Sequence, residues 1–220
     1  MSDGNRQEGR RVILCFGDSN TWGYSPATAA RYAPEVRWTG VMREALGEGH
    51  TVVEEGLSGR TTVFDDPITP GRRGDDMLPR LCESHSPLDL VLIMLGTNDL
   101  KHRCNANPWD IAKGLERLAI LASLPAYGRG GRAPAILLIA PPPLARLSEF
   151  AESFEGGAEK SRRLAPLVEL FARGLGCGFL DAGQAARCSD LDGIHLEPEA
   201  HRALGLAAAR KAREMLDASP

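Results

Sequence analysis

The sequence alternates short apolar runs with longer amphipathic segments, and this alternation predicts its secondary structure. The runs are rich in valine, isoleucine, leucine and other strand-forming residues and are bounded by charged residues, glycine or proline. Runs of this length and composition are typical of strands buried in a parallel sheet. Five strands are therefore predicted, at residues 12–16, 51–55, 88–95, 135–140 and 178–181.

The segments between these runs are predicted to be helices, because their apolar residues recur at spacings of three and four. Asn107 and Pro108 mark the start of one helix, since asparagine caps a first turn and proline fits its first position. Asp75 or Asp76 is expected to cap another helix that runs to about residue 85. The remaining helices are predicted at residues 35–46, 159–175 and 198–216.

Strands that alternate with helices in this way predict right-handed crossovers and a three-layer α/β/α sandwich around a five-stranded parallel sheet. The run at 88–95 is the most apolar and is expected to be the central strand. We expect residues 1–10 to form a frayed tail and residues 11–220 to form a single domain. The segment 141–157 begins with three prolines and is expected to form a lid or a subunit contact.

Composition and charge exclude several classes of function. The chain has 220 residues, of which 43% are hydrophobic and 25% are charged, and its formal net charge is −3. Because lysine and arginine are scattered, nothing marks a surface for nucleic acid or an anionic membrane, and a small or neutral substrate is expected. The polar, acid-containing start is unlike a signal or transit peptide, and no apolar stretch approaches the roughly 20 residues that span a bilayer. We therefore expect a soluble, cytoplasmic protein.

The sequence Gly17-Asp18-Ser19-Asn20 follows the first predicted strand and is expected to form a turn that presents the Ser19 hydroxyl at the edge of the sheet. A serine hydroxyl needs a base within hydrogen-bond reach and a third group that orients this base. Asp192 and His195, three residues apart on one loop, supply both. The remaining histidines (His50, His85, His102 and His201) lack this combination of a rim loop and a nearby acid.

Acyl transfer also needs hydrogen-bond donors that face the developing oxyanion. Three candidates are the backbone N–H groups of Ser19 and Gly59 and the side-chain amide of Asn98. Gly59 can instead be a plain turn glycine, and Asn98 can close a loop as an Asx-turn. Asp18 and Asp99 are expected to fix their turns by accepting backbone N–H bonds.

Other chemistries remain as alternatives. The five cysteines show no CxxC pair, which argues against a disulfide framework or a thiolate zinc site, but Cys104 or Cys188 is a candidate nucleophile. A metal-dependent hydrolase would use Asp75 and Asp76 with His85. A non-catalytic α/β domain that binds a ligand at the same rim is a third alternative.

Four blocks of the sequence resemble those of the SGNH (GDSL-type) hydrolase superfamily, in the order typical of that family. The blocks are Gly17-Asp18-Ser19, Gly59, Gly96-Thr97-Asn98-Asp99 and Asp192-Gly193-Ile194-His195. The surrounding sequence is similar to the arylesterase/acyltransferase subgroup. This resemblance implies a flavodoxin-like sheet, no metal and no organic cofactor. It also implies Ser19 as nucleophile, His195 as base, Asp192 as its orienting acid, and Ser19, Gly59 and Asn98 as the oxyanion hole.

The chain departs from the family pattern at two positions. Asn20 stands where leucine commonly follows the serine, and Gly59 stands where some subgroup members have alanine. Both departures are expected to affect the preference for acyl group or nucleophile.

The sequence therefore predicts an esterase that cleaves small aryl or short-chain acyl esters through an acyl-enzyme and that also transfers acyl groups to alcohols. A carbohydrate O-acetyl esterase of the same superfamily is the alternative. The subgroup resemblance also favours a homo-oligomer. The expected substrate-binding residues are Asn20, Trp22, Phe150, Phe154 and Ile194.

Overall fold

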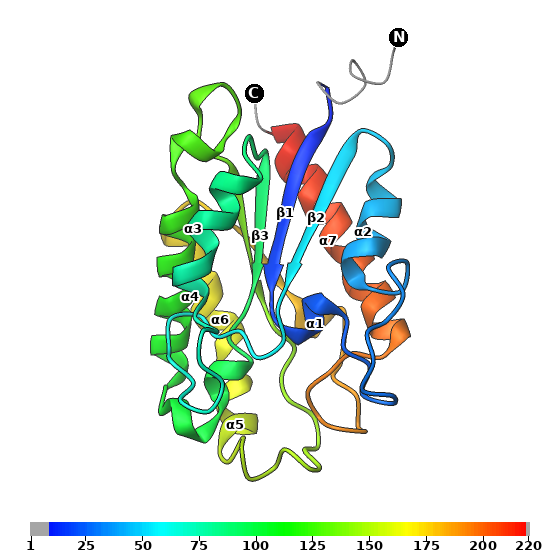
Figure 1. The fold of residues 1–220 in the computed structure, drawn as a ribbon, viewed down its shortest axis with the longest axis vertical. Helices are drawn as coiled ribbons and strands as arrows, with labels where there is room; N and C mark the ends of the chain where they lie inside the picture. The colour runs from blue at the N-terminus through cyan, green and yellow to red at the C-terminus, as the bar shows by residue number, and fades with distance from the viewer. Residues whose placement is uncertain (1–8, 219–220) are drawn as a thin grey trace.

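A five-stranded parallel sheet with the strand order β2-β1-β3-β4-β5 forms the centre of the computed structural model, which describes residues 9–218 (Figure 1). This order is that of flavodoxin-like sheets, so the predicted fold class is confirmed. The most apolar run, β3, is the central strand, as predicted. Most of the predicted tail, residues 1–8, lies outside the described residues. The strands are β1 Arg11–Gly17, β2 His50–Gly56, β3 Leu90–Met94, β4 Ala135–Ala140 and β5 Gly178–Asp181.

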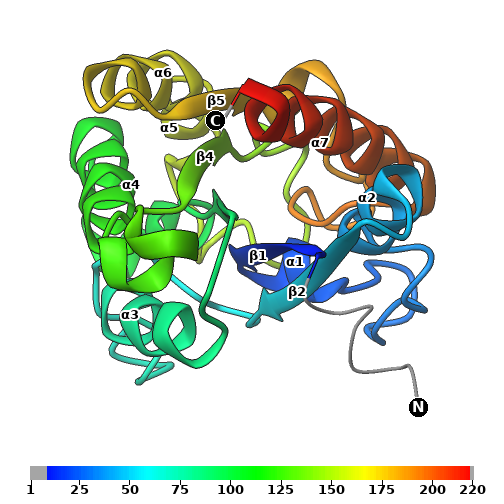
Figure 2. The same cartoon turned by 90° about the horizontal axis from the view of Figure 1, so that it is seen from above.

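Side chains alternate between the two faces of the sheet, and each face has its own apolar core. Along β1, Ile13 and Cys15 join one core while Leu14 and Phe16 join the other. Figure 2 shows α2 and α7 on one side of the sheet and α3, α4 and α6 on the other. The covering helices are α2 Trp38–Leu46, α7 Pro198–Ala218, α3 Gly74–Ser84, α4 Pro108–Ala122 and α6 Leu164–Gly174.

The first residue of a helix is set by local sequence in α4 and by contacts with the preceding loop in α3. The Asn107 side chain accepts a hydrogen bond from the Asp110 N–H at 2.9 Å and caps α4, as predicted. The predicted cap of α3 by Asp75 or Asp76 is wrong, because the helix already begins at Gly74. Carbonyl groups of the preceding loop, including that of Thr62, accept the N–H groups of its first turn, so no aspartate is needed there.

The single helix predicted at residues 159–175 is two helices, α5 Gly157–Ser161 and α6 Leu164–Gly174. Pro166 explains the break, because a proline ring clashes with the carbonyl group four residues earlier in a continuous helix. Pro166 instead lies in the first turn of α6. The helix predicted from residue 35 likewise begins later, at Trp38.

The carboxyl ends of the strands lie at one edge of the sheet, the lower edge in Figure 1, where α1 (Ser19–Trp22) and the connecting loops gather. A third apolar cluster covers this edge. Leu144 and Phe154 from the segment 141–157 pack there with Leu100 and Ile194. Within residues 9–218, no helix combines the length and apolar character that crossing a membrane requires.

Candidate active site

Ser19 begins α1 directly after the end of β1. Asp18 caps this short helix, because its Oδ1 accepts a hydrogen bond from the Asn20 N–H at 2.9 Å. A side chain at Gly17 would place its Cβ 2.0 Å from Thr21 Oγ1, so the sharp turn from strand to helix requires glycine. The turn therefore leaves the Ser19 side chain at the carboxyl edge of the sheet.

Ser19, His195 and Asp192 form a continuous chain of hydrogen bonds. Ser19 Oγ lies 2.9 Å from His195 Nε2, and His195 Nδ1 lies 2.6 Å from Asp192 Oδ2. Asp192 Oδ1 accepts two further bonds, from the N–H groups of Ile194 at 2.8 Å and His195 at 2.9 Å. All three residues are buried. The arrangement has the geometry of a nucleophile, a base and an orienting acid.

The hydrogen bonds to Asp192 determine its charge state. Burial acts to raise the pKa of Asp192, but the bonds from the His195 side chain and from two backbone N–H groups outweigh it and lower the pKa. Asp192 is therefore ionised at neutral pH. An ionised acceptor at Nδ1 keeps a proton on that nitrogen and leaves Nε2 to accept the proton of Ser19.

Asn20 holds the histidine loop against the serine turn. Its Nδ2 donates to the carbonyl oxygen of Ile194 at 3.2 Å, and its Oδ1 accepts from the Leu196 N–H at 3.1 Å. The Asn20 side chain thus joins the two residues on either side of His195. Tyr24 adds a ring contact to the same histidine, with ring centroids 4.2 Å apart.

The three expected oxyanion donors lie on three different loops of this edge. Gly59 adopts φ +81°, a backbone conformation that residues other than glycine rarely take. Among the described residues, no acceptor is present for the backbone N–H of Ser19 or of Gly59. Asn98 donates one amide N–H to the Arg60 carbonyl oxygen at 3.1 Å, which leaves its second N–H available.

The buried Arg60 side chain connects these loops through hydrogen bonds. Arg60 donates to the carbonyl oxygens of Gly17 and Glu55, and its guanidinium lies 4.0 Å from the Phe16 ring centroid. Burial lowers the pKa of Arg60 to about 10, so it remains charged at neutral pH.

Asp99 has the structural role that the sequence predicted, as does Asp18. Its carboxylate accepts the Thr62 N–H at 2.9 Å and the Thr62 hydroxyl at 2.5 Å, which joins the loops after β2 and β3. Burial raises the pKa of Asp99 to about 6.

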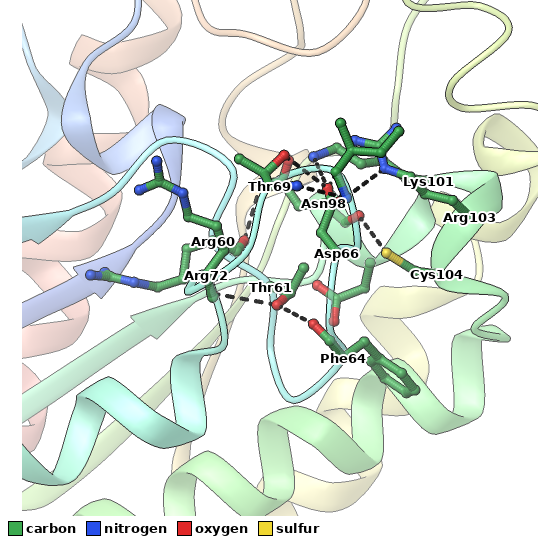
Figure 3. Close-up of polar contacts among 12 residues, drawn as sticks. Arg60, Thr61, Phe64, Asp66, Thr69, Arg72, Asn98, Lys101, Arg103 and Cys104 are labelled. Atoms are coloured by element: carbon green, nitrogen blue, oxygen red, sulfur yellow. Dashed lines mark hydrogen bonds and ion pairs between the residues drawn. The ribbon is translucent and has the colours of Figure 1, made fainter.

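Asp66 makes a second connection between the same two loops. Its side chain is fully buried and accepts from Arg103 Nε at 2.6 Å, Arg103 Nη2 at 2.8 Å and Lys101 Nζ at 3.0 Å (Figure 3). The Ile68 N–H adds a backbone bond at 3.0 Å. The bonds from Arg103, opposed by burial and aided by Lys101, hold the pKa of Asp66 well below its ordinary value.

A cavity of ≈ 300 Å³ opens beside Ser19 and His195. It is lined by Phe150, Phe154 and Ile194, three of the residues expected to contact substrate, and by the proposed donors at Gly59 and Asn98. The lining also contains residues that the sequence did not single out, namely Tyr24, Ser58, Lys101, Arg103 and Ser153.

The other two expected substrate contacts, Asn20 and Trp22, do not line this cavity. Asn20 is buried at 1% exposure, because both ends of its amide are bonded to the histidine loop. Trp22 faces Arg31, whose guanidinium lies 5.1 Å from its ring centroid. The structure therefore places Asn20 in the framework of the site and Trp22 outside it.

The residues of the alternative chemistries are not brought together. Asp75 lies at the start of α3 and pairs with Arg73, whereas His85 follows the other end of the helix and contacts Glu55 at 2.8 Å. Across residues 9–218, no group of three or more His, Cys, Asp or Glu side chains is arranged to hold a metal ion.

The two candidate cysteines are not prepared for nucleophilic attack. Burial raises the pKa of Cys104 to about 11 and that of Cys188 to about 12. Their thiols donate to the carbonyl oxygens of Asn98 and Pro142 rather than to a histidine. A thiol in such an environment is not a reactive thiolate at neutral pH.

Comparisons with known proteins agree in sequence and in structure. The sequence model of the GDSL-like Lipase/Acylhydrolase family matches residues 15–203. The solved structure of an aryl esterase from M. smegmatis is 44% identical, with a TM-score of 0.89 over 93% of this chain and 99% of that chain. A carbohydrate acetylesterase from Sinorhizobium meliloti is 43% identical, with a TM-score of 0.90 over 94% of this chain and 100% of that chain. A comparison with curated protein sequences gave no match.

Proposed function

The chain belongs to the GDSL-like Lipase/Acylhydrolase family and is a carboxylic ester hydrolase, and from this premise we propose that Ser19, His195 and Asp192 cleave small esters through an acyl-enzyme. The observation that carries the proposal is the hydrogen-bonded chain from Ser19 Oγ through His195 to Asp192, with distances of 2.9 Å and 2.6 Å. Ser19 and His195 lie at the wall of the cavity, where a substrate carbonyl group can approach the Ser19 hydroxyl.

In the first step, Ser19 Oγ attacks the ester carbonyl carbon while His195 Nε2 takes the hydroxyl proton. The carbonyl oxygen becomes an oxyanion and accepts hydrogen bonds from the N–H groups of Ser19 and Gly59 and from the free N–H of Asn98. Ionised Asp192 stabilises the imidazolium that forms. When the tetrahedral intermediate collapses, His195 gives its proton to the leaving alcohol, and the acyl group stays on Ser19.

In the second step, His195 removes a proton from a water molecule, which attacks the carbonyl carbon of the acyl-enzyme. The same donors stabilise the second oxyanion, and collapse of this intermediate breaks the bond between the acyl group and Ser19 Oγ. The carboxylic acid leaves, and the proton returns from His195 to Ser19.

The dimensions of the cavity support small substrates. A volume of ≈ 300 Å³ is at the lower end of the range for ligand sites, which is about 300–1,000 Å³. The two similar solved structures are described as an aryl esterase and a carbohydrate acetylesterase. Aryl and short-chain acyl esters are therefore our first candidates, and O-acetylated sugars are the second.

Acyl transfer to alcohols is a further part of the proposal. Phe150, Phe154 and Ile194 give one side of the cavity an apolar surface, which favours an alcohol over water as acceptor. Product partitioning in water that contains a modest amount of alcohol tests this point. Formation of the carboxylic acid alone would contradict transfer while leaving hydrolysis intact.

Substitution of the nucleophile tests the central proposal. Ser19→Ala is expected to lower kcat/KM by at least about 10⁴-fold and to abolish labelling by a fluorophosphonate. Ser84→Ala, an exposed serine at the end of α3, serves as the matched control and is expected to retain activity and labelling. A fluorophosphonate adduct on another residue, or an active Ser19→Ala variant, would contradict the assignment of the nucleophile.

We also propose that the protein forms a homo-oligomer and works in the cytoplasm. The oligomer is supported by the resemblance to the arylesterase/acyltransferase subgroup. All five cysteines are unpaired, as is usual in a reducing compartment. Light scattering of the purified protein and cell fractionation test the two statements separately.

A further inference from the structure

The cavity wall carries two cationic side chains, Lys101 and Arg103, which share one buried counterion, Asp66, behind the wall. We propose that Lys101 and Arg103 bind a carboxylate of the substrate, so that the enzyme selects small esters that carry a carboxylate on the acyl group or on the alcohol. This inference rests on the proposed function, because it concerns the substrate of the same site.

Asp66 fixes both cations in place. It binds Arg103 through two parallel bonds and Lys101 through one, and its own side chain has no exposed surface. The Lys101 and Arg103 side chains retain 11% and 24% exposure and line the cavity. The cations are therefore held in position before a ligand arrives, which limits the entropy lost on binding.

The bonding capacity of Asp66 is used up, whereas that of the two cations is not. Besides its three bonds to the cations, Asp66 accepts from the Ile68 N–H and from the Thr69 N–H and hydroxyl. Lys101 Nζ uses one of its three N–H donors for Asp66. Arg103 uses Nε and Nη2, and its Nη1 has no acceptor among the described residues. N–H donors of both cations thus remain for a ligand.

The cavity wall carries an excess of positive charge, which also favours a ligand carboxylate. Two positive side chains share one carboxylate, and none of the described residues that line the cavity is an aspartate or a glutamate. The acids deeper in the site are already bonded: Asp192 accepts from its own loop, and Asp99 accepts from Thr62 on the loop after β2. A ligand carboxylate would therefore meet donors without meeting a competing acid at the surface.

The position of the cations connects this subsite to the reaction. Lys101 and Arg103 follow Asn98 on the same loop, through the short helical turns Asn98–Leu100 and His102–Cys104. Ser153, whose backbone carbonyl accepts the His102 N–H at 2.9 Å, also lines the cavity. A substrate bound there extends along the loop that also supplies a proposed oxyanion donor.

Matched pairs of esters test the inference. 4-Nitrophenyl hemisuccinate is compared with 4-nitrophenyl pentanoate, and 4-acetoxybenzoate with phenyl acetate. We expect a higher kcat/KM for the carboxylate-bearing member of at least one pair. Lys101→Met is expected to lower that preference about ten-fold, because it removes a charge-assisted hydrogen bond, and Lys101→Arg is expected to retain most of it.

Lys211→Met is the control for the loss of one lysine charge. Lys211 lies on α7 and pairs with Glu214 at 3.4 Å, so this variant is expected to keep the wild-type preference. A measurement on the wild-type enzyme needs no variant: raising the NaCl concentration is expected to reduce the preference through screening.

The inference is overturned if the preference is absent in both pairs, or if it is unchanged by Lys101→Met and by salt. Its failure is distinct from failure of the proposed function. If only the inference fails, the wild-type enzyme still hydrolyses the neutral esters and still forms a fluorophosphonate adduct on Ser19. If the proposed function fails, both of these reactions are lost.

Discussion

The two halves of the site are held together by different kinds of interaction. The Ser19 half consists of the loops after β1 and β5, which carry Ser19 and His195. In this half an uncharged side chain, Asn20, connects the two loops through backbone groups at 3.1 Å and 3.2 Å. The Asn98 half consists of the loops after β2 and β3, which carry Gly59 and Asn98. Here the connections are made by two buried carboxylates, Asp66 and Asp99.

The difference follows the chemistry of each half. His195 gains and loses a proton in the proposed reaction, and a neutral amide beside it adds no charge that would compete with Asp192 for the imidazolium. The Asn98 half meets negative charge from the oxyanion and, by our inference, from the substrate, and its cations are held by Asp66. We therefore expect the Ser19 half to respond little to salt and pH through its framework, and the Asn98 half to respond more.

After loss of the nucleophile itself, the largest effect is expected from Asn98, the proposed oxyanion donor of the Asn98 half. Asn98→Ala removes a donor that acts mainly in the transition state, so kcat is expected to fall about 10²–10³-fold with a much smaller change in KM. Steady-state kinetics on a neutral aryl ester measure both constants. An unchanged kcat would place Asn98 in the framework alone, where it bonds to the Arg60 carbonyl oxygen.

The next prediction concerns the pH dependence of stability. A buried titratable group lies in or next to each half: Asp99 in the Asn98 half, with a raised pKa, and His201 beside the Ser19 half, with a lowered pKa. Burial lowers the pKa of His201 to about 4, and its Nδ1 accepts the Trp38 N–H at 3.2 Å. As pH falls from about 6.5 to 4 the unfolded state binds this proton first, so stability is lost toward acid. Asp99, with its pKa raised to about 6, has the opposite sign, since the unfolded state releases its proton first as pH rises from about 4 to 6.

Each of these two groups changes the free energy of unfolding by roughly 3 kcal/mol between its two pKa values, and the two changes have opposite directions with pH. We expect His201→Gln to leave a protein that loses stability as pH rises from about 4 to 6. Asp99→Asn should instead make the loss of stability toward acid steeper. Urea unfolding at a series of pH values measures both slopes, and parallel slopes in the two variants would refute the opposite signs.

A smaller effect is expected from Asp66, for which the neighbouring residue provides a control. Asp66→Asn leaves two cations without their shared counterion and is expected to lower the free energy of unfolding by about 2 kcal/mol. Asp65 is 74% exposed in its side chain and lies 3.6 Å from Arg73, so Asp65→Asn should cost less than about 0.5 kcal/mol. Equal effects in the two variants would show that the Asp66 network does not hold the Asn98 half together.

The smallest effect is expected from Asn20. Asn20→Ala leaves the Leu196 N–H and the Ile194 carbonyl oxygen without partners and is expected to cost about 1–2 kcal/mol of stability. Thermal unfolding and a substrate panel distinguish this role from the one expected from the sequence. A change in ester preference with unchanged stability would make Asn20 a substrate contact.

Much of the fold is predictable because its strands are buried and its helices are amphipathic. The runs at β3 and β4 are almost fully buried, so their composition alone identifies them. The start of α3 was not predictable, because its first turn is satisfied by carbonyl groups of a preceding loop rather than by its own aspartates. The break between α5 and α6 has a signal in the sequence, Pro166, although the periodicity of the apolar residues alone predicts one helix.

The candidate site divides in the same way. The functional groups of Ser19, Asp192 and His195 were proposed from residue chemistry and motif order, and the structure places them within hydrogen-bond distance. The Asp66 network depends on contacts between residues 35 and 37 positions apart, which no local pattern reveals. The contacts of Asn20, which the sequence predicts as a substrate-binding residue, are hidden for the same reason, since its partners lie 174 and 176 residues away.

The distance along the chain between Ser19 and His195 predicts that activity is a late event in folding. The two residues are 176 positions apart, and His195 lies between β5 and α7, so their contact brings the two ends of the fold together. A chain in which only β2, β1, β3 and β4 were paired would contain Ser19, Gly59 and Asn98 but would lack the base. Recovery of ester hydrolysis during refolding is therefore expected to report closure of the 176-residue loop between Ser19 and His195, whereas burial of the central strands reports pairing of segments that are closer in sequence.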